Sequence, residues 1–370
     1  MRLTEQRASL PLALGARPAS YRWVRPARPL AAGAVLLLIA SIVVSATQGA
    51  VPLPALTVWH IILDRIPILS DYLGVTPYWP EAHASIVLQI RLPRVLLAGL
   101  VGASLAVAGA TYQGMFRNPL ADPYLIGVAS GAGLGAVAAM SLRWPYTTLG
   151  LLAVPLAAFA SGLLTVAVVY ALAKVGRAVP ASNLILAGVA VSSFTTALTS
   201  FLMLRSSGEL RRALAWLMGG ATMSGWQPVL ALLPYWVVGL GILLTLGHAL
   251  NVLQFGDEQA QQLGLPVTRV RRLIIVAASL TTAAAVSFAG IIGFVGLIIP
   301  HILRLLTGAD YRRLLPLSLV GGAALLLAAD VLARVLLAPQ ELPVGIVTAL
   351  AGAPFFLWVL RRSRQANFWS

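Results

Sequence analysis

The sequence predicts an all-α, polytopic membrane protein with about ten transmembrane helices. Of its 370 residues 59% are hydrophobic and only 10% are charged, whereas a soluble domain has about a quarter charged residues. Uncharged runs of 18 residues or more recur along the chain, and about 20 apolar residues cross the hydrocarbon core as a helix. There is no cysteine, which excludes disulfides, thiolate metal sites and a cysteine nucleophile.

The first expected helix follows a segment, residues 1–29, that holds six arginines and four prolines. A secretory signal peptide has the same order of basic and apolar residues. Here the basic segment is long, the apolar run 30–47 has spanning length, and the next residues, GAVPLP, predict a turn rather than a cleavage site. We therefore assign 1–29 to a cytosolic segment, 30–361 to the transmembrane domain and 362–370 to a cytosolic tail.

Further helices are expected in the uncharged runs 95–116, 123–142, 144–173, 178–204, 213–256, 273–303, 314–329 and 342–360. Run 213–256 is long enough for two spans, or for one span and a helix on the surface. Run 273–303 can hold one long span or two short spans broken near Gly290. Hydropathy alone therefore leaves nine to eleven spans.

The placement of the basic residues reduces this range. The net charge of +15 comes from arginines at the ends of apolar runs, which indicates topology rather than nucleic-acid binding. If 213–256 holds one span and 273–303 holds two, 18 basic residues lie on the side of the termini and 8 on the other. Loops rich in Lys and Arg face the cytosol, so ten spans with both termini cytosolic are expected.

The polar stretch GDEQAQQLGLPVTRVRR, residues 256–272, interrupts two long uncharged runs and lies on the expected cytosolic side. Gly256 should end the incoming helix, and Asp257 can cap a new one whose first turn is acidic. Gly264 and Pro266 should end that helix after about two turns. The stretch thus predicts two short helices hinged at 264–266, with an ordinary solvated loop as the alternative.

Small residues recur at helical spacing within the expected spans. Gly102, Ala106 and Ala110 are four residues apart, as are Gly131 and Gly135. Such positions let helix backbones approach closely in a membrane. Tight packing within one subunit is the expected use.

The chain lacks the residues that it would need to bind ATP or to couple transport to an ion gradient without another subunit. It has no GxxxxGK[ST] loop, so an ATPase would be another subunit. Carriers coupled to ions need ionisable groups at membrane depth, and only Asp330 lies near the end of a span. Arg334, one turn later, can pair with it. The four histidines are far apart and predict no metal site.

Four stretches together resemble the FecCD family of ABC-transporter permeases. They begin with RLPRVLLAGL, GDEQAQQLGLP, GFVGLIIPHILRL and ADVLARVLLAPQELP, and cover residues 91–136, 256–266, 293–316 and 329–362. Residues 1–90 depart most, with a longer basic N-terminus and a longer external segment near 64–81. The resemblance implies ten spans, a homodimer in membrane lipid, two copies of a cytosolic ABC ATPase that binds ATP and Mg²⁺, and an extracytoplasmic binding protein. No cofactor is expected on this chain.

The resemblance also implies roles for particular residues. Coupling to the ATPase is expected at about 256–268, with Asp257, Glu258, Gln261, Leu263, Gly264, Leu265 and Pro266. Docking of the binding protein is expected at Arg91, Arg94 and Arg334 on the outer face, where a guanidinium can bind a carboxylate through two hydrogen bonds. Anchoring of helix ends at the membrane surface is the alternative for these arginines.

The fifth span is expected to line a pathway between the two subunits, with Ser192, Ser193, Thr195, Thr196, Thr199 and Ser200. These hydroxyls form a weakly polar wall, or else bond back to their own helix. An inner gate is expected at Asn118, Leu120, Ala181 and Ser182. The expected function is import of cobalamin, haem or a ferric siderophore across the cytoplasmic membrane of a prokaryote. A secondary carrier or channel without an ATPase is the alternative.

Overall fold

Helix α5 (Leu92–Phe116) is the centre of the computed structural model, which describes residues 27–49, 51–74, 76–142, 148–176, 179–205, 208–220 and 225–365. Most of its residues are buried, because they are apolar or small on all sides and other helices surround them. These neighbours are α10 (Gln227–Thr245), α13 (Val267–Ala289), α14 (Val295–Thr307) and α15 (Tyr311–Val335).

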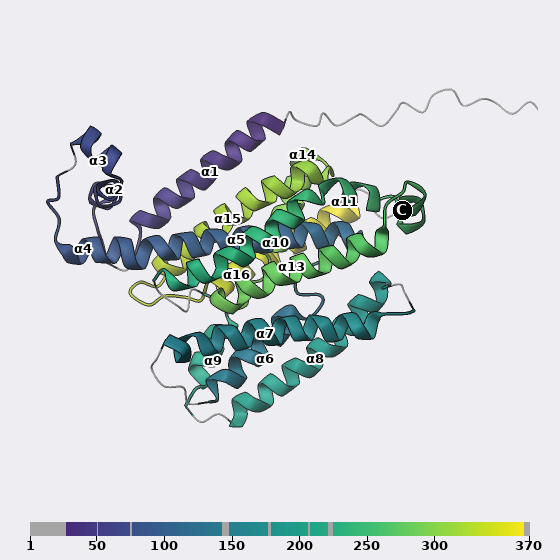
Figure 1. Cartoon of the computed structure of the whole chain (residues 1–370). Helices are drawn as coiled ribbons and strands as arrows, with labels where there is room; N and C mark the ends of the chain where they lie inside the picture. Colours follow the sequence, from purple (N-terminus) through teal and green to yellow (C-terminus); the bar gives the residue numbers. More distant parts are fainter. Residues whose placement is uncertain are drawn as a thin grey trace, which may run out of the picture.

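A second layer packs against this group through α13 (Figure 1). It consists of α6 (Val128–Met140), α7 (Thr148–Ala173) and α8 (Ala181–Arg205), followed by the short helix α9 (Leu210–Leu217). Helix α8 contacts α6 and α7 with one side only, and much of its surface is open. The last helix, α16 (Val344–Gln365), contacts α14 and α15.

The described residues form helices and no strands, which confirms the all-α prediction. Seven helices among them are long and apolar enough to cross a membrane. They are α1 (Ala27–Thr47), the continuous helix 81–116, α7, α8, α10, α13 and α15. The shorter apolar helices α6, α14 and α16 occupy the other three runs in which spans were expected.

The two ambiguous runs are resolved as the arginine distribution predicted. Run 213–256 contains one long helix, α10, followed by the short α11 (Gly247–Leu253). Run 273–303 contains two helices, because α13 ends at Ala289 and α14 begins at Val295.

The small residues serve packing within the chain, as expected. The α carbon of Gly102 on α5 lies so close to Gly322 on α15 that a Cβ on either would meet the other's carbonyl oxygen. In the same way Gly135 on α6 faces the carbonyl oxygen of Ala157 on α7. Ala106 and Ala110 are fully buried. A larger side chain at the two glycines would separate these helix pairs.

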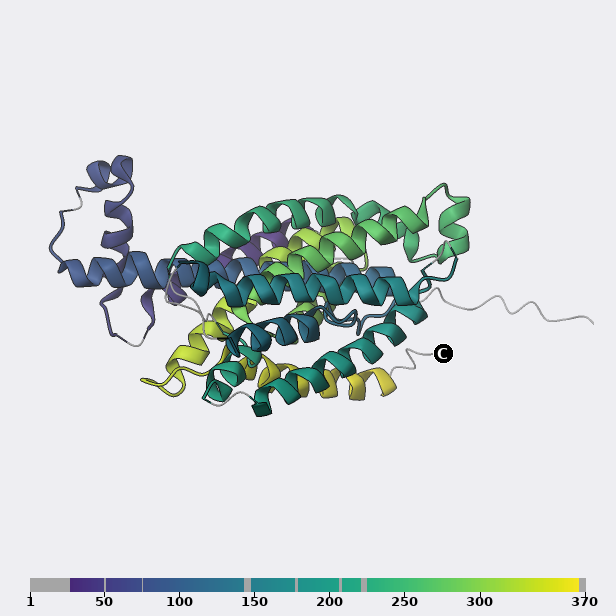
Figure 2. The same cartoon turned by 60° about the horizontal axis from the view of Figure 1, so that its bottom comes forward.

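The bundle has two different ends (Figures 1 and 2). One end carries α12 (Asp257–Gln262), the beginning of α1 and the end of α16, so the described termini lie on one side. The other end carries a protruding group of α2 (Ala55–Asp64), α3 (Pro67–Leu73) and α4 (Glu81–Ser85). From α4 the chain passes through one π-helical segment, η1 (Ile86–Arg91), into α5. The expected segment 1–29 and tail 362–370 lie largely outside the described residues.

Candidate functional site

The polar stretch at residues 256–272 forms a protruding joint between α11 and α13. Gly256, with φ of 102°, and Gly264, with φ of 83°, bound the single short helix α12. Both φ values fall where a residue with a Cβ is strained, so glycine allows the two sharp reversals. The expected second short helix is wrong, because after Pro266 the chain continues directly into the 23-residue helix α13.

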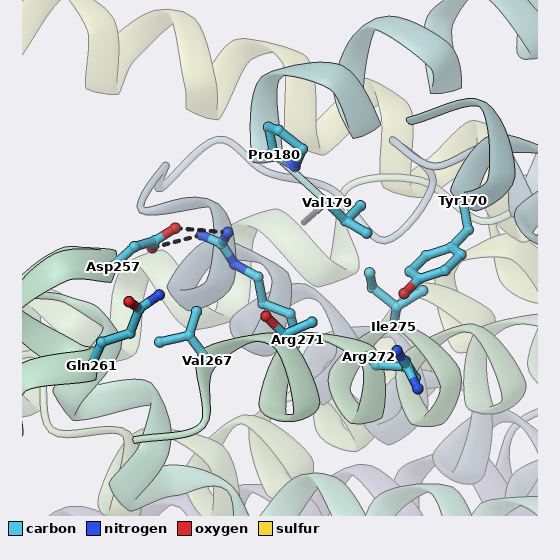
Figure 3. A pocket seen from close by; sticks show the side chains of 10 residues that line it. Tyr170, Val179, Pro180, Asp257, Gln261, Val267, Arg271, Arg272 and Ile275 are labelled. Atoms are coloured by element: carbon cyan, nitrogen blue, oxygen red, sulfur yellow. Dashed lines mark hydrogen bonds and ion pairs between the residues drawn. The ribbon is translucent and has the colours of Figure 1, made fainter. Parts of the chain in front are cut away.

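An ion pair holds α12 against α13. Arg271 of α13 donates from Nη2 to Oδ1 of Asp257 at 2.8 Å, and its Nη1 lies 2.8 Å from Oδ2 (Figure 3). The expectation that Asp257 caps α12 is therefore wrong: Gly256 is the N-cap residue, and no side chain caps this helix. The paired carboxylate fixes the helix from the side, and Ala260, fully buried, fixes it from below.

The other face of the joint is free in the described structure. Glu258 and Pro266 are exposed, and Leu265 packs partly into the core. Gln261 is exposed too, but it lies on the same side of α12 as Asp257. Leu263 is 66% exposed, and Phe255, which sequence reasoning missed, is 65% exposed. Two large apolar side chains thus flank an acidic and amide surface, an arrangement that suits contact with another protein.

A cavity of about 170 Å³ separates the joint from the second layer (Figure 3). Asp257, Gln261, Arg271 and Arg272 line one side. The other side is formed by Tyr170 at the end of α7 and by Val179 and Pro180, directly before α8. The joint therefore lies beside the loop that leads to Ala181 and Ser182, two of the expected gate residues. A movement of α12 and α13 would therefore change the space next to this loop.

The remaining expected gate residues lie in the turn after α5. The side-chain oxygen of Asn118 accepts a hydrogen bond from the backbone N–H of Leu120 at 2.9 Å, which fixes the turn. Leu120 is 49% exposed and Asn118 is half-buried. Further along this loop, the carbonyl of Leu125 touches Gly188 of α8. The two loops assigned to the gate thus both adjoin α8, although no contact joins these gate residues directly in the described interactions.

The α8 hydroxyls fall on two faces. Thr195 and Thr199 are buried and donate to the carbonyls of Val191 and Thr195, and Ser192 accepts a hydrogen bond from Ser130 of α6 at 3.1 Å. Ser193, Thr196 and Ser200 are exposed on a common stripe, since they are three or four residues apart. Ser193 and Ser200 also bond back to carbonyls of their own helix. The alternative of bonding back to their own helix is therefore confirmed for Ser193, Thr195, Thr199 and Ser200, whereas a lining role stays a prediction for the exposed stripe.

The three outer arginines lie together with Asp330, but their exposure differs from the expectation. Arg334 and Arg91 are only 4% and 5% exposed, so the idea that all three stand on the surface is wrong for these two. Arg94 retains 19% exposure. The predicted pair of Arg334 with Asp330 is confirmed, with Nε 3.0 Å from Oδ2.

The buried arginines hold the end of α1. Nη1 of Arg91 donates to the carbonyls of Ala46 and Thr47 at 3.3 and 2.7 Å, and Nη2 donates to that of Val51. Arg334 donates to the carbonyl of Gln48 and, at 3.2 and 2.9 Å, to the carbonyl and hydroxyl of Ser45. The last carbonyls of a helix have no partners within it, and cations at this end are favourable. We call this arrangement the α1 clasp, formed by Arg91, Arg334 and Asp330.

Arg94 bridges the clasp to the outer surface. Its Nε lies 3.0 Å from Oδ1 of Asp330, and its Nη1 donates to Oε2 of Glu341 at 2.7 Å. Glu341 lies in the loop between α15 and α16 and is 42% exposed. The sequence analysis did not identify Glu341 as a partner of Arg94. The sequence indicated only that an acidic residue lies in an expected outer loop, shortly after the motif ADVLAR at residues 329–334.

The chain is similar to proteins of known family. A model of the FecCD transport family matches residues 37–362. The cobalamin import system permease protein BtuC of Halobacterium salinarum is 48% identical over 318 residues, which are 86% of this chain and 82% of that protein. The hemin transport system permease protein HmuU of Yersinia pestis is 38% identical, over 90% of this chain and 95% of its own.

Two further similarities agree with these. The Fe(3+) dicitrate transport system permease protein FecD of Escherichia coli is 39% identical over 80% of this chain and 95% of its own. Among solved structures, an inward-facing metal-chelate type ABC transporter superposes with a TM-score of 0.77 at 32% identity, covering 90% of this chain and 99% of that one. Sequence and fold therefore point to one group of proteins.

Proposed function

The chain belongs to the FecCD transport family, and from this we propose that it is the membrane-spanning permease subunit of an ATP-driven importer of a bulky metal chelate. The relatives are named for cobalamin, hemin and ferric dicitrate. These three compounds share a chelated metal and differ in shape. The chelate class is therefore proposed for this chain, rather than one compound.

The proposal includes the partners expected for such a subunit. Two copies of this chain would form a homodimer, and two copies of a cytosolic ATPase would bind ATP and Mg²⁺ and supply the energy. A binding protein would deliver the chelate from outside, so the permease would lie in the cytoplasmic membrane of a prokaryote. The pathway would run between the two copies, along the exposed α8 stripe of Ser193, Thr196 and Ser200.

The observation that carries the proposal is the joint at α12. It is a short helix clamped by the pair of Asp257 and Arg271, it exposes Phe255 and Leu263, and it adjoins the loop before Ala181. A rigid contact of this kind transmits the closure of a partner as a movement of whole helices. An ATPase docked here would move α13 and the gate loop together.

Reconstitution tests the proposed energy source. We expect proteoliposomes that contain this chain and its ATPase to take up a radiolabelled chelate, with the binding protein outside and ATP inside. Replacing ATP by a non-hydrolysable analogue is expected to stop uptake. Comparable uptake by the permease alone, driven by an ion gradient, would instead establish the alternative of a secondary carrier.

Docking of the binding protein is proposed at Arg94, the most exposed of the three outer arginines, at 19%. We expect Arg94→Glu to weaken binding of the binding protein by on the order of 30-fold or more, because an exposed carboxylate would then repel the carboxylate of the partner. The measurement is the Kd across a salt series, with transporter in nanodiscs. The wild-type Kd should rise with salt more steeply than that of the variant.

Glu341→Gln is the matched control for this prediction, because it removes charge beside Arg94 without touching Arg94 itself. This variant should bind at least as tightly as the wild type, since Nη1 of Arg94 would be released from Glu341. Equal affinity and equal salt dependence for Arg94→Glu and wild type would leave Arg94 a purely structural residue.

A further inference from the structure

The group of α2, α3 and α4, residues 55–85, forms an outer lobe that stands apart from the bundle (Figures 1 and 2). A small core joins its base to the rest: Val58 and Ile61 of α2 pack with Ala46, Leu53 and Val87. The hydroxyl of Tyr78 lies 3.2 Å from Oγ1 of Thr57 and 3.2 Å from Nδ1 of His60. The lobe is therefore a folded extension with a fixed base.

The tip of the lobe presents large apolar side chains to its surroundings. Ile68 and Tyr72 on α3 are 84% and 89% exposed, and Leu73 is 53% exposed. Ile68 and Tyr72 are four residues apart, so they are neighbours on one face of the short helix. Single exposed apolar residues are ordinary, but a contiguous group of this kind indicates contact with a membrane or with a protein.

The length of the helix below the lobe argues against contact between the lobe tip and the lipid bilayer. From Glu81 to Phe116 the chain is one continuous helix of 36 residues, which is about 54 Å at 1.5 Å per residue. The hydrocarbon core is about 30 Å thick and each headgroup layer adds about 6 Å. With Phe116 at the inner edge of the core and an ordinary tilt of about 20°, Glu81 stands more than about 10 Å beyond the outer headgroups. The lobe, which includes Glu81, therefore reaches beyond the headgroups.

The position of the lobe argues against a second copy of this chain. In Figure 1 the lobe and α1 lie on the upper side of the bundle and α8 lies on the lower side, and in Figure 2 the lobe again lies opposite α8. The proposed pathway between two copies runs along α8. The lobes of such a dimer would point away from the partner copy, so each tip remains uncovered by the other.

The lobe also has a charge opposite to that of the chain as a whole. Its ionised residues are Asp64, Asp71 and Glu81 against Arg65, which is a net charge of −2, whereas the whole chain carries +15. The base of the lobe continues through η1 into the start of α5, which carries Arg94. One connected outer surface thus holds an apolar, acidic part on the lobe and a basic group at Arg94. That group consists of Arg91, Arg94 and Arg334 against Asp330 and Glu341, which is a net charge of +1.

We infer that the tip of the outer lobe, at Ile68, Tyr72 and Leu73, is a second docking surface for the extracytoplasmic binding protein of this importer. The inference rests on the proposed function, which supplies that partner. On the binding protein, the surface that contacts the lobe tip would be an apolar patch bordered by lysine or arginine. It would lie next to the carboxylate that Arg94 binds. Opposite charges at the two contacts would admit the binding protein in one orientation.

The test compares three permeases, each assembled with its ATPase in nanodiscs, for binding of the purified, fluorescently labelled binding protein of the same system. The double variant Ile68→Glu and Tyr72→Glu removes the apolar face. Thr76→Glu, at an exposed polar residue of the same lobe, adds charge without removing apolar surface. We expect the double variant to raise the Kd at least tenfold and Thr76→Glu to raise it less than threefold.

A second measurement separates this inference from the proposed function. ATP-driven uptake by the wild type, together with equal Kd values for all three permeases, would overturn the docking surface and leave the importer intact. Failure of the wild type to bind the protein or to use ATP would overturn the proposed function itself. At unchanged Kd, a changed oligomeric state of the double variant would assign the tip to a second copy. A Tm that depends on the nanodisc lipid in the wild type but not in the double variant would assign it to lipid, and either result would also overturn the inference.

Discussion

Gly264→Val is expected to abolish ATP-driven uptake of the chelate while the permease still assembles with its ATPase. Gly264 has φ of 83° and no atom within 4 Å of the place where a Cβ would stand, so the substitution acts on the backbone alone. A β-branched residue in this region costs about 1–2 kcal/mol or more, which favours another path for residues 263–266. Helix α12 would then leave its fixed angle to α13. The measurements are uptake in proteoliposomes and the rate of ATP hydrolysis.

The reason for the expected loss is mechanical, and a matched variant tests it. Gly308→Val introduces a β-branched residue at the same φ of 83°, also without a neighbouring atom, in the turn between α14 and α15. Gly308 also has ψ of −171°, in a region that is essentially restricted to glycine, so this variant should lose at least as much stability and still retain most uptake. Equal loss of uptake in both variants would mean that general destabilisation, rather than the joint, explains the result.

The ion pair of Asp257 and Arg271 allows a second test of whether uptake requires α12 to be held against α13. Asp257→Arg alone should reduce uptake more than tenfold, since two arginines would then face each other across α12 and α13. Adding Arg271→Asp restores an opposite pair and should restore much of the uptake. Hydrolysis of ATP that continues without uptake in the single variant would identify uncoupling directly. Full uptake in Asp257→Arg would remove the pair from the mechanism.

Arg334→Ala is expected to cause the largest loss of stability of any single arginine-to-alanine substitution in the outer group. The variant leaves the carbonyls of Ser45 and Gln48 without their donor and removes one of the two arginines that neutralise Asp330, which is 2% exposed. Breaking a buried ion pair by removing one partner costs about 3–5 kcal/mol. We expect the apparent Tm in detergent to fall by on the order of 5 °C or more.

Two comparisons separate this role from docking. Arg334→Lys should not restore the Tm, because one ammonium group cannot reach Asp330 and two acceptors on α1 in the fork geometry of a guanidinium. Arg212→Ala removes an arginine that is 64% exposed and 3.6 Å from Glu209, and it should leave the Tm unchanged. An Arg334→Ala protein with wild-type Tm and weakened binding of the binding protein would return Arg334 to the docking surface.

The transmembrane architecture was predictable because the bilayer imposes a length and a charge rule on every span. The positions of arginines resolved runs 213–256 and 273–303 as one long span and as two, and the structure agrees. The glycine spacing likewise predicted the close crossings at Gly102 and Gly135. The joint at 256–266 was located from its polarity and its glycines, although its second short helix proved to be the start of α13.

The partners of individual charged side chains were not predictable. Local spacing indicated the pair of Arg334 with Asp330, since they are one helical turn apart, but Asp257 with Arg271 and Arg94 with Glu341 join residues from different elements. Hydropathy likewise placed Arg91 and Arg334 at a membrane boundary. At such a position the sequence cannot distinguish an arginine that faces water from one that faces the end of another helix.

The sequence by itself determined the family, the helical fold and the order of the apolar helices, because each of these depends on composition over about 20 residues or on motifs continuous in the chain. Only the tertiary structure decided which arginines are buried, which face of α12 is free and where the outer lobe stands. Burial and exposure depend on which other segments meet α1, α12 and the outer lobe in space. These contacts join segments that are far apart in the sequence, and no local pattern encodes which segments meet.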